Sequence, residues 1–280
     1  MASQEGAFRA REAEDAALRA RAAPGRDRMF LAASALVFVA SAAGTIVWCG
    51  AMAGGMPMPG GWTMSMAWMR MPGQSWPGAA VMFMGMWLVM MTAMMTPSLV
   101  PMLRSYRRTL RGAGETRLGA LTTLVGAGYF LVWAAVGAVA YPVGIAVASA
   151  EMRMPGLARA VPAATGIVLV LAGSLQLTAW KARRLDACRN SPACCGPVSL
   201  HPLGAVRAGL RAGLQCALCC APPMAVLLVA GVMDLAVMAG VTTAITLERT
   251  VPAALLAARA CGLVIVAAGA AVLVRALFRL

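Results

Sequence analysis

The sequence predicts an all-α fold, a polytopic bundle of transmembrane helices, and three observations support that prediction. Of its 280 residues, 61 % are hydrophobic and only 12 % are charged, which is unusual for a soluble domain of this size. Uncharged stretches recur that are long enough to cross a hydrocarbon core of about 30 Å. The chain is also rich in alanine and glycine, the small residues that let helices approach closely in lipid.

Six apolar segments are expected to form the helices. In chain order they cover residues 29–49, 78–103, 118–148, 162–180, 204–247 and 261–278. The fifth segment is far longer than the membrane requires at about 1.5 Å per helical residue. It is either one broken or tilted helix, or two helices that turn near residues 231–234. We favour six spans, which would return the C-terminus and Arg275 to the side of the N-terminus; seven spans are the alternative.

The formal charge of +14 is distributed unevenly along the chain. Arginine and lysine gather between residues 104 and 117 and between residues 181 and 211, whereas the alternating loops at 50–77 and 151–159 carry few basic residues. This alternation follows the positive-inside bias of membrane proteins, so it indicates topology and not nucleic-acid binding. It predicts a multi-pass protein of a bacterial inner membrane, with the lipid bilayer as its first partner and the N-terminus in the cytoplasm.

Two regions are expected to lie outside the apolar helices. Residues 1–28 have mixed charge and no apolar centre, so they predict a cytoplasmic N-terminal tail, disordered or helical on the membrane surface, and not a signal peptide. Residues 29–280 are expected to form a single transmembrane helical domain with an external, Met-rich loop at residues 50–77. The sequence shows no internal repeat and no soluble domain.

Most of the 22 methionines lie between residues 52 and 102. In the loop they alternate with Gly, Pro and Trp, in a segment too broken to span the membrane, so burial does not account for them. A thioether is a soft, neutral ligand that binds Cu(I) without losing a proton. On the second helix the methionines form stripes that either line a path or simply pack a neighbouring helix. The candidate copper ligands are Met56, Met58, Met64 and Met66 in the loop and Met90, Met91, Met94 and Met95 on the helix.

The cysteines form two further groups. Cys216, Cys219 and Cys220 are expected on one helix face, close enough to share a soft metal, and the double proline that follows is expected to bend the helix. Cys188 begins a second, cytoplasmic group in which Arg184 and Arg189 are expected to lower the thiol pKa. Three alternatives compete with metal binding: a thioredoxin-like pair, which lacks a βαβ pattern, a zinc ribbon, whose second half would lie in the membrane, and plain packing.

The remaining ionisable residues narrow the chemistry. His201 is the only histidine, which excludes a multi-histidine metal site within one chain. Asp234 lies in the long apolar run, where it is either functional or at the surface of a turn. Residues 248–249 predict a helix end. No catalytic set of Ser, His and Asp and no phosphate-binding glycine loop is present, so the sequence does not predict an enzyme.

Four stretches resemble one known family in order and content. They are WLVMMTAMMTPSLVP (87–101), YFLVWAAVGAVAYP (129–142), LQLTAWKARRLDACRNSP (175–192) and the block from 213 to 249 that begins GLQCALCC. The family is DUF2182, described as predicted metal-binding integral membrane proteins and often called copper chaperones.

The resemblance implies that a specific subset of residues handles metal. The implicated residues are Met90, Met91, Met94 and Met95 with Pro97 and Pro101, Cys188, and Cys216, Cys219 and Cys220. The chain departs from the family at three positions: Arg184 replaces a usual cysteine, Ala212 a usual histidine and Pro222 a usual aromatic residue. Cys194 and Cys195 are candidates to substitute in the cytoplasmic loop.

Together these observations predict a Cu(I)-handling inner-membrane protein, a chaperone or transfer protein, that passes the metal to an acceptor protein. With no ATPase motif in the sequence, movement would occur by ligand exchange. One alternative is an accessory subunit of a membrane metalloenzyme such as a copper oxygenase, in which the methionines pack a partner helix. Another is a membrane thiol-redox protein. A second copy of the chain is a further candidate partner.

Overall fold

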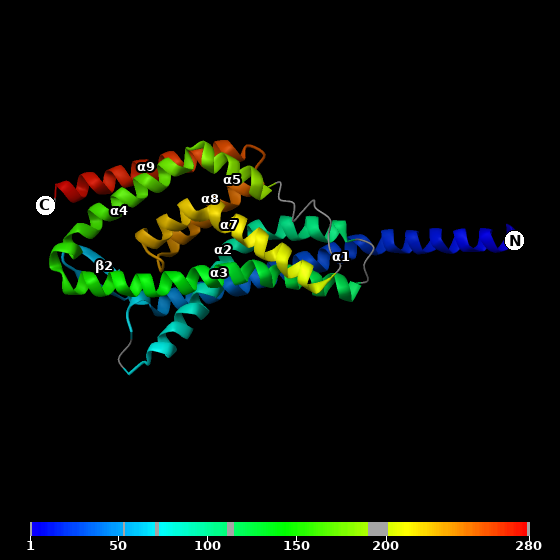
Figure 1. Ribbon diagram of the computed structural model, residues 1–280, viewed down its shortest axis with the longest axis horizontal. Helices are drawn as coiled ribbons and strands as arrows, with labels where there is room; N and C mark the ends of the chain where they lie inside the picture. Colours follow the sequence, from blue (N-terminus) through cyan, green and yellow to red (C-terminus); the bar gives the residue numbers. More distant parts are fainter. Residues whose placement is uncertain (1, 53, 71–72, 111–114, 190–200, 279–280) are drawn as a thin grey trace.

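The computed structural model describes residues 2–52, 54–70, 73–110, 115–189 and 201–278, and of residues 2–26 and 115 only the backbone. The described part of the chain is 87 % helical, and six of its helices are long and apolar enough to cross a membrane. Figure 1 shows how the helices are arranged. The predicted bundle and its six spans are therefore confirmed. The spans are Asp27–Ala51, Trp76–Thr109, Thr116–Arg153, Pro155–Gln176, Pro202–Ala230 and Ala254–Leu277.

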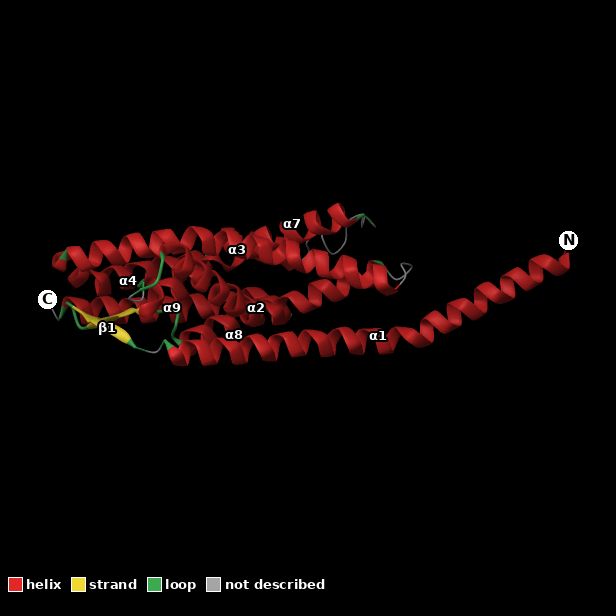
Figure 2. Cartoon of the chain, turned by 90° about the horizontal axis from the view of Figure 1, so that it is seen from below, coloured by secondary structure: helices red, strands yellow, loops and turns green. Residues whose placement is uncertain are grey.

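The first helix, α1 (Ala2–Ala51), joins the predicted tail to the first span without a break. Figure 2 shows its N-terminal part extending well beyond the rest of the bundle. The span within it begins at Asp27, close to the expected boundary at residue 28. The tail backbone is thus helical, and its cytoplasmic location stays a prediction.

The predicted external loop contains a small β-hairpin. β1 (Gly55–Met58) and β2 (Trp62–Ser65) pair antiparallel, and a single 3-10 turn, η1 (Met66–Trp68), follows. Positive φ angles at Gly60 and Gly61, 106° and 75°, make the tight turn between the strands. The Trp62 indole N–H donates a hydrogen bond of 2.9 Å to the Ala158 carbonyl, which fixes the hairpin on the bundle. We call this end of the bundle the hairpin end.

Seven further helices lie in the part of the chain that the structure describes. They are α2 (Trp76–Thr109), α3 (Glu115–Arg153), α4 (Pro155–Gln176), α5 (Ala179–Arg189), α7 (Pro202–Ala230), α8 (Leu235–Thr250) and α9 (Ala254–Leu277). The main apolar core lies between α2, α3, α7 and α8, while α4 and α9 pair along one side of it (Figure 1).

The long fifth apolar segment is two helices, as one of its two alternatives predicted. The turn between α7 and α8 uses Gly231, whose φ of 132° is rare for residues with a side chain. The exposed Asp234 carboxylate accepts hydrogen bonds of 2.8 and 3.0 Å from the backbone N–H groups of Ala236 and Val237. Asp234 is therefore the N-cap of α8 at a surface turn.

The C-terminal helix ends at the hairpin end, opposite the N-terminus (Figure 1). α8 has only 16 residues, about 24 Å, so it does not count as a span; it runs back from the hairpin end to the middle of α7, where Arg249 lies near Cys216, and α9 then runs to the hairpin end again. Arg275 and Ala276 consequently line the same cavity as Gly60 and Trp62. The expectation that the C-terminus and Arg275 lie on the side of the N-terminus is wrong, because it did not include this short returning helix.

Glycines allow two helix pairs to pack with their backbones in contact. A Cβ atom at Gly209 of α7 would lie 2.1 Å from the Val125 carbonyl oxygen of α3, and one at Gly213 would lie 2.8 Å from the Tyr129 carbonyl oxygen. Gly173 of α4 approaches Gly262 of α9 in the same way. The alanine- and glycine-rich composition thus serves close helix packing, as the sequence predicted.

Candidate metal centre

The three cysteines of α7 are buried, but they do not point at one common site. Cys216 and Cys220, four residues apart, face the main core, whereas Cys219 lies in a second cluster with Leu185 of α5 and Ala258 of α9. Among the described residues, no group of three His, Cys, Asp or Glu side chains could hold a metal ion. The three thiols thus form no single closed group: the Cys220 sulfur contacts Cys216 on one side and Cys219 on the other, and Cys219 also reaches toward Cys188 of α5.

A methionine completes a sulfur set around the first two thiols. The Cys216 Sγ atom lies 3.7 Å from the Cys220 Sγ atom and 4.0 Å from the Met95 Sδ atom of α2. Three sulfurs bound to one metal in a plane, each at about 2.3 Å, are roughly 4 Å apart. We call Met95, Cys216 and Cys220 the inner sulfur centre, and its spacing suits a three-coordinate soft ion.

Tyr129 of α3 orients one of these thiols. Its hydroxyl donates a hydrogen bond of 2.9 Å to the Cys216 Sγ atom, and both residues are fully buried. This contact depends on the close approach of α3 to α7, which Gly209 and Gly213 permit. A hydrogen bond to a metal-bound thiolate supports the charged form of the sulfur.

The remaining thiol of α7 has a cysteine partner on α5. Cys219 and Cys188 belong to the same apolar cluster and share a hydrogen bond. This bond and burial raise the pKa of the Cys188 thiol above its usual value. The expectation that nearby arginines lower it is wrong, because Arg184 lies over the Trp180 ring and Arg189 donates to the backbone carbonyls of residues 248 and 251.

A different arginine, Arg249 near the end of α8, faces the sulfurs. It donates a hydrogen bond of 3.1 Å to the Ser98 hydroxyl and a second one to the Cys188 Sγ atom. The guanidinium also lies within electrostatic range of Cys216 and Cys220. A soft monovalent ion held by two thiolates would carry a net charge of −1, and this arginine would supply the balancing positive charge.

A buried ion pair supports the helix that carries the thiols. The Lys181 ammonium lies 2.6 Å from a Glu248 carboxylate oxygen, with both side chains at most 1 % exposed, and Gln176 donates a hydrogen bond of 2.6 Å to the other oxygen. Lys181 also donates a hydrogen bond of 2.8 Å to the Cys219 carbonyl. That carbonyl is free because Pro223, four residues later, has no N–H to donate to it.

Sequence reasoning missed these polar residues. Lys181 counts as part of a basic loop in the sequence, and Glu248 and Arg249 as a plain helix end. A signal was present, because all three lie in stretches quoted for the family resemblance. An acidic residue that follows a long apolar run also calls for a cationic partner.

The predicted helix methionines are all in the core. Met90, Met91, Met94 and Met95 of α2 are each at most 3 % exposed. With Met86 they form a continuous buried column at spacings of four and five residues, which ends at the inner sulfur centre. Met82, which lies on α2 one turn before Met86, is 37 % exposed and so lies outside this buried column.

The loop methionines divide into packed and accessible residues. Met58 and Met64 are buried against Ala148 and Ala158, so the premise that burial does not account for the loop methionines is wrong for these two. Met56 is exposed and Met66 is half-buried. Met56 pairs with Met64 across the hairpin and shares a strand face with Met58, whereas Met66 lies in η1 and lines a different cavity.

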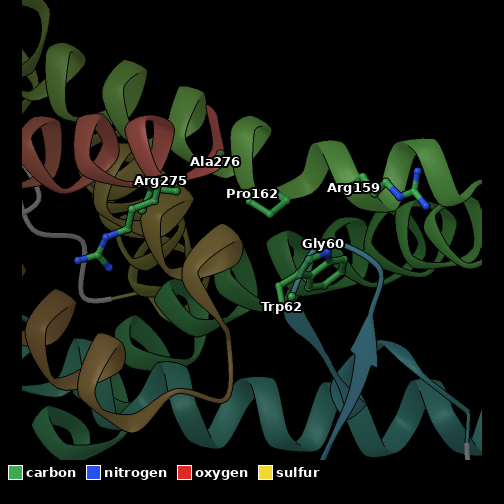
Figure 3. Close-up of a pocket in the computed structure, with 8 residues that line it drawn as sticks. Gly60, Trp62, Arg159, Pro162, Arg275 and Ala276 are labelled. Atoms are coloured by element: carbon green, nitrogen blue, oxygen red, sulfur yellow. The ribbon is translucent and has the colours of Figure 1, made fainter. Parts of the chain in front are cut away.

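Other sequence candidates lie apart from the sulfur centre. The cavity beside Gly60 and Trp62 contains no sulfur ligand, and the guanidinium groups of Arg159 and Arg275 point away from each other there (Figure 3). Cys261 on α9 belongs to none of the described sulfur groups. Cys194 and Cys195 fall outside the described residues.

The fold and this site together define a multi-pass helical membrane protein with a buried group of thiol and thioether sulfurs. The chain belongs to the PpoB2 family, described as copper chaperones, because the model of that family matches residues 84–272, more than half of the chain. The match includes every residue of the inner sulfur centre. No curated protein and no solved structure matches the chain.

Proposed function

We propose that this protein binds Cu(I) through methionine and cysteine sulfurs inside the membrane and passes it to an acceptor by ligand exchange. Membership of a copper chaperone family supports copper as the cargo. The observation that carries the ligand assignment is the position of the Cys216 sulfur, which lies 3.7 Å from the Cys220 sulfur and 4.0 Å from the Met95 sulfur. A set of one neutral thioether and two thiols suits Cu(I) better than a hard cation.

The buried methionines of α2 provide a path to this centre. Each neutral thioether binds Cu(I) without a change of protonation, so the ion can move along the column by exchanging one sulfur for the next. At Cys216 and Cys220 it displaces the thiol protons and becomes more tightly held. The methionine column would therefore deliver Cu(I) to the inner sulfur centre, and the two thiols would retain it there.

The Cys188–Cys219 pair is the proposed acceptor side of the centre. Cys219 follows Cys216 by three residues and precedes Cys220 by one, and its sulfur lies against α5. Copper leaving the inner sulfur centre would reach this second thiol pair before it reaches a partner protein. Arg249 contacts Cys188 and lies near Cys216, so one positive charge serves both thiol pairs.

Metal analysis of the full chain tests this proposal. The protein is purified in detergent, loaded with Cu(I) without oxygen, treated with a competing Cu(I) chelator and measured by mass spectrometry. The Cys216→Ser/Cys220→Ser variant should lose chelator-resistant copper, by more than about 100-fold in affinity, because two ligands are gone. The matched control is Cys261→Ser, which removes a thiol outside the centre and should retain copper like the wild type.

The opposite result would favour the accessory-subunit alternative. If the folded wild type holds no more chelator-resistant copper than the double serine variant, the cysteines are not ligands. The methionines would then be packing residues, and a stoichiometric membrane partner should co-purify with the chain.

A further inference from the structure

Methionines from three separate segments gather around a small cavity at the hairpin end. Two of them, Met82 and Met86, lie on α2, and the others follow α1 or belong to the segment after β2. The cavity has a volume of about 30 Å³, which is space for one water-sized body. Its five methionines are Met52, Met66, Met69, Met82 and Met86, and we call it the methionine pocket.

The other side chains that line this cavity are neutral. They include the aromatic rings of Trp48, Phe83 and Tyr141, whose faces attract cations. The Gln74 amide donates a hydrogen bond of 3.5 Å to the Met82 sulfur, which restrains one thioether at the outer rim. None of the described residues that line the pocket is a lysine, an arginine or a carboxylate, so this lining offers no charged ligand to a hard divalent ion.

Close packing alone does not account for this arrangement. The neighbouring Met58 and Met64 are at most 9 % exposed and pack against Ala148 and Ala158. Met is flexible enough to fill irregular gaps, yet here five methionines surround a space that stays open. Met82 is 37 % exposed, so the pocket is also accessible from the outside of the bundle.

We propose that the methionine pocket is a second Cu(I) site, at which the ion enters before it reaches the inner sulfur centre. The assignment of the cargo rests on the proposed function. Met86 belongs to both the pocket and the buried column, and it precedes Met95 by nine residues, or about 13.5 Å along the helix. The pocket takes a soft monovalent cation through neutral thioethers and does not bind Zn²⁺.

Silver binding by the full chain tests this site separately from the thiol centre. Ag(I) is a soft monovalent probe that is not oxidised by air, and its stoichiometry is measured by mass spectrometry after removal of free ion. The test variant is Met52→Leu/Met66→Leu/Met82→Leu, which keeps apolar bulk. The matched control is Met152→Leu/Met154→Leu, two exposed methionines at the same end of the bundle.

The pocket predicts a specific pattern of stoichiometry. Wild type and the control should bind the same number of Ag(I) ions, the triple leucine variant one fewer, and Cys216→Ser/Cys220→Ser also one fewer. Bound Ag(I) should also protect Met52, Met66 and Met82 from oxidation by peroxide while Met152 and Met154 oxidise at an unchanged rate. If the triple leucine variant binds as much Ag(I) as the control and protection is absent, the pocket is not a site, whatever the cysteine variant shows.

Discussion

The methionine pocket and the inner sulfur centre both consist of sulfur-containing side chains, but the surroundings of the sulfur atoms differ. The pocket is lined by neutral thioethers and aromatic rings near the protein surface. The inner sulfur centre adds two thiols, a tyrosine hydroxyl and an arginine, and the helix that carries it is tied to a buried ion pair. If both sites bind Cu(I) as proposed, the difference in charge separates capture from retention, because a neutral site releases Cu(I) more readily than a dithiolate site does.

The residues matched by the family model also separate the inner sulfur centre from the methionine pocket. The match begins at residue 84, so it includes the inner sulfur centre and the whole buried column, but of the pocket methionines only Met86. We therefore expect the thiol centre to depend on the charged network around it and the pocket to be independent of that network. The following variants test this expectation, from the largest effect to the smallest.

Lys181→Met should have the largest effect on stability. It leaves the Glu248 carboxylate buried without its cation, and breaking a buried ion pair costs about 3–5 kcal/mol. In detergent, the thermal unfolding temperature of this variant should be much lower than that of the wild type. It should recover in Lys181→Met/Glu248→Leu, which removes both charges. A single variant as stable as the wild type would contradict the role of the pair.

Arg249→Met should weaken copper retention at the inner sulfur centre. The dithiolate complex loses its balancing charge, and the loss of such a supporting residue lowers metal affinity about 10- to 100-fold. Arg249→Lys is the control, because it keeps the charge, and it should bind more tightly than the methionine variant. Chelator competition measures both, and equal losses in the two variants would show that charge is not the cause.

Met90→Leu/Met94→Leu should slow the filling of the inner sulfur centre several-fold without changing its final occupancy. Leucine keeps the apolar bulk of the column but removes two of its exchange steps. Stopped-flow measurement of Cu(I) arrival at the thiols, followed by thiolate absorbance, gives the rate. An unchanged rate would mean that copper reaches the thiols by another route.

Tyr129→Phe should have the smallest effect. It removes one hydrogen bond to Cys216, worth about 0.5–1.5 kcal/mol, so copper affinity should fall by about tenfold or less. The ring remains, and the packing between α3 and α7 is unchanged. Affinity in chelator competition that is unaffected, or lost entirely, would contradict this role for the hydroxyl.

The sequence was informative about the spans because hydrophobicity over about 20 residues has a direct physical meaning in a membrane. It was less informative about the hairpin, although a signal existed. Met56, Met58 and Met64 fall at alternate positions on either side of Gly60–Gly61, which is the pattern of two strands joined by a tight turn. Interpreting this segment as an irregular loop led to the wrong conclusion about methionine burial.

The contacts of the candidate site could be predicted only in part. The residue types were evident, because soft sulfur ligands cluster in two short stretches. The sequence did not show which sulfurs meet. Cys219 contacts α5, and Met95 of α2 reaches Cys216 of α7 across the main core, so both contacts depend on the tertiary fold. Lys181 and Glu248 lie far apart in sequence, so only the tertiary fold reveals their pairing.

The most direct test of the central claim is X-ray absorption at the copper edge for the Cu(I)-loaded full chain. Using the Met52→Leu/Met66→Leu/Met82→Leu variant isolates the inner sulfur centre from the pocket. The proposal predicts a first shell of three sulfurs at about 2.3 Å, from Met95, Cys216 and Cys220. A first shell made of oxygen or nitrogen would contradict it, because copper would then be bound away from these sulfurs.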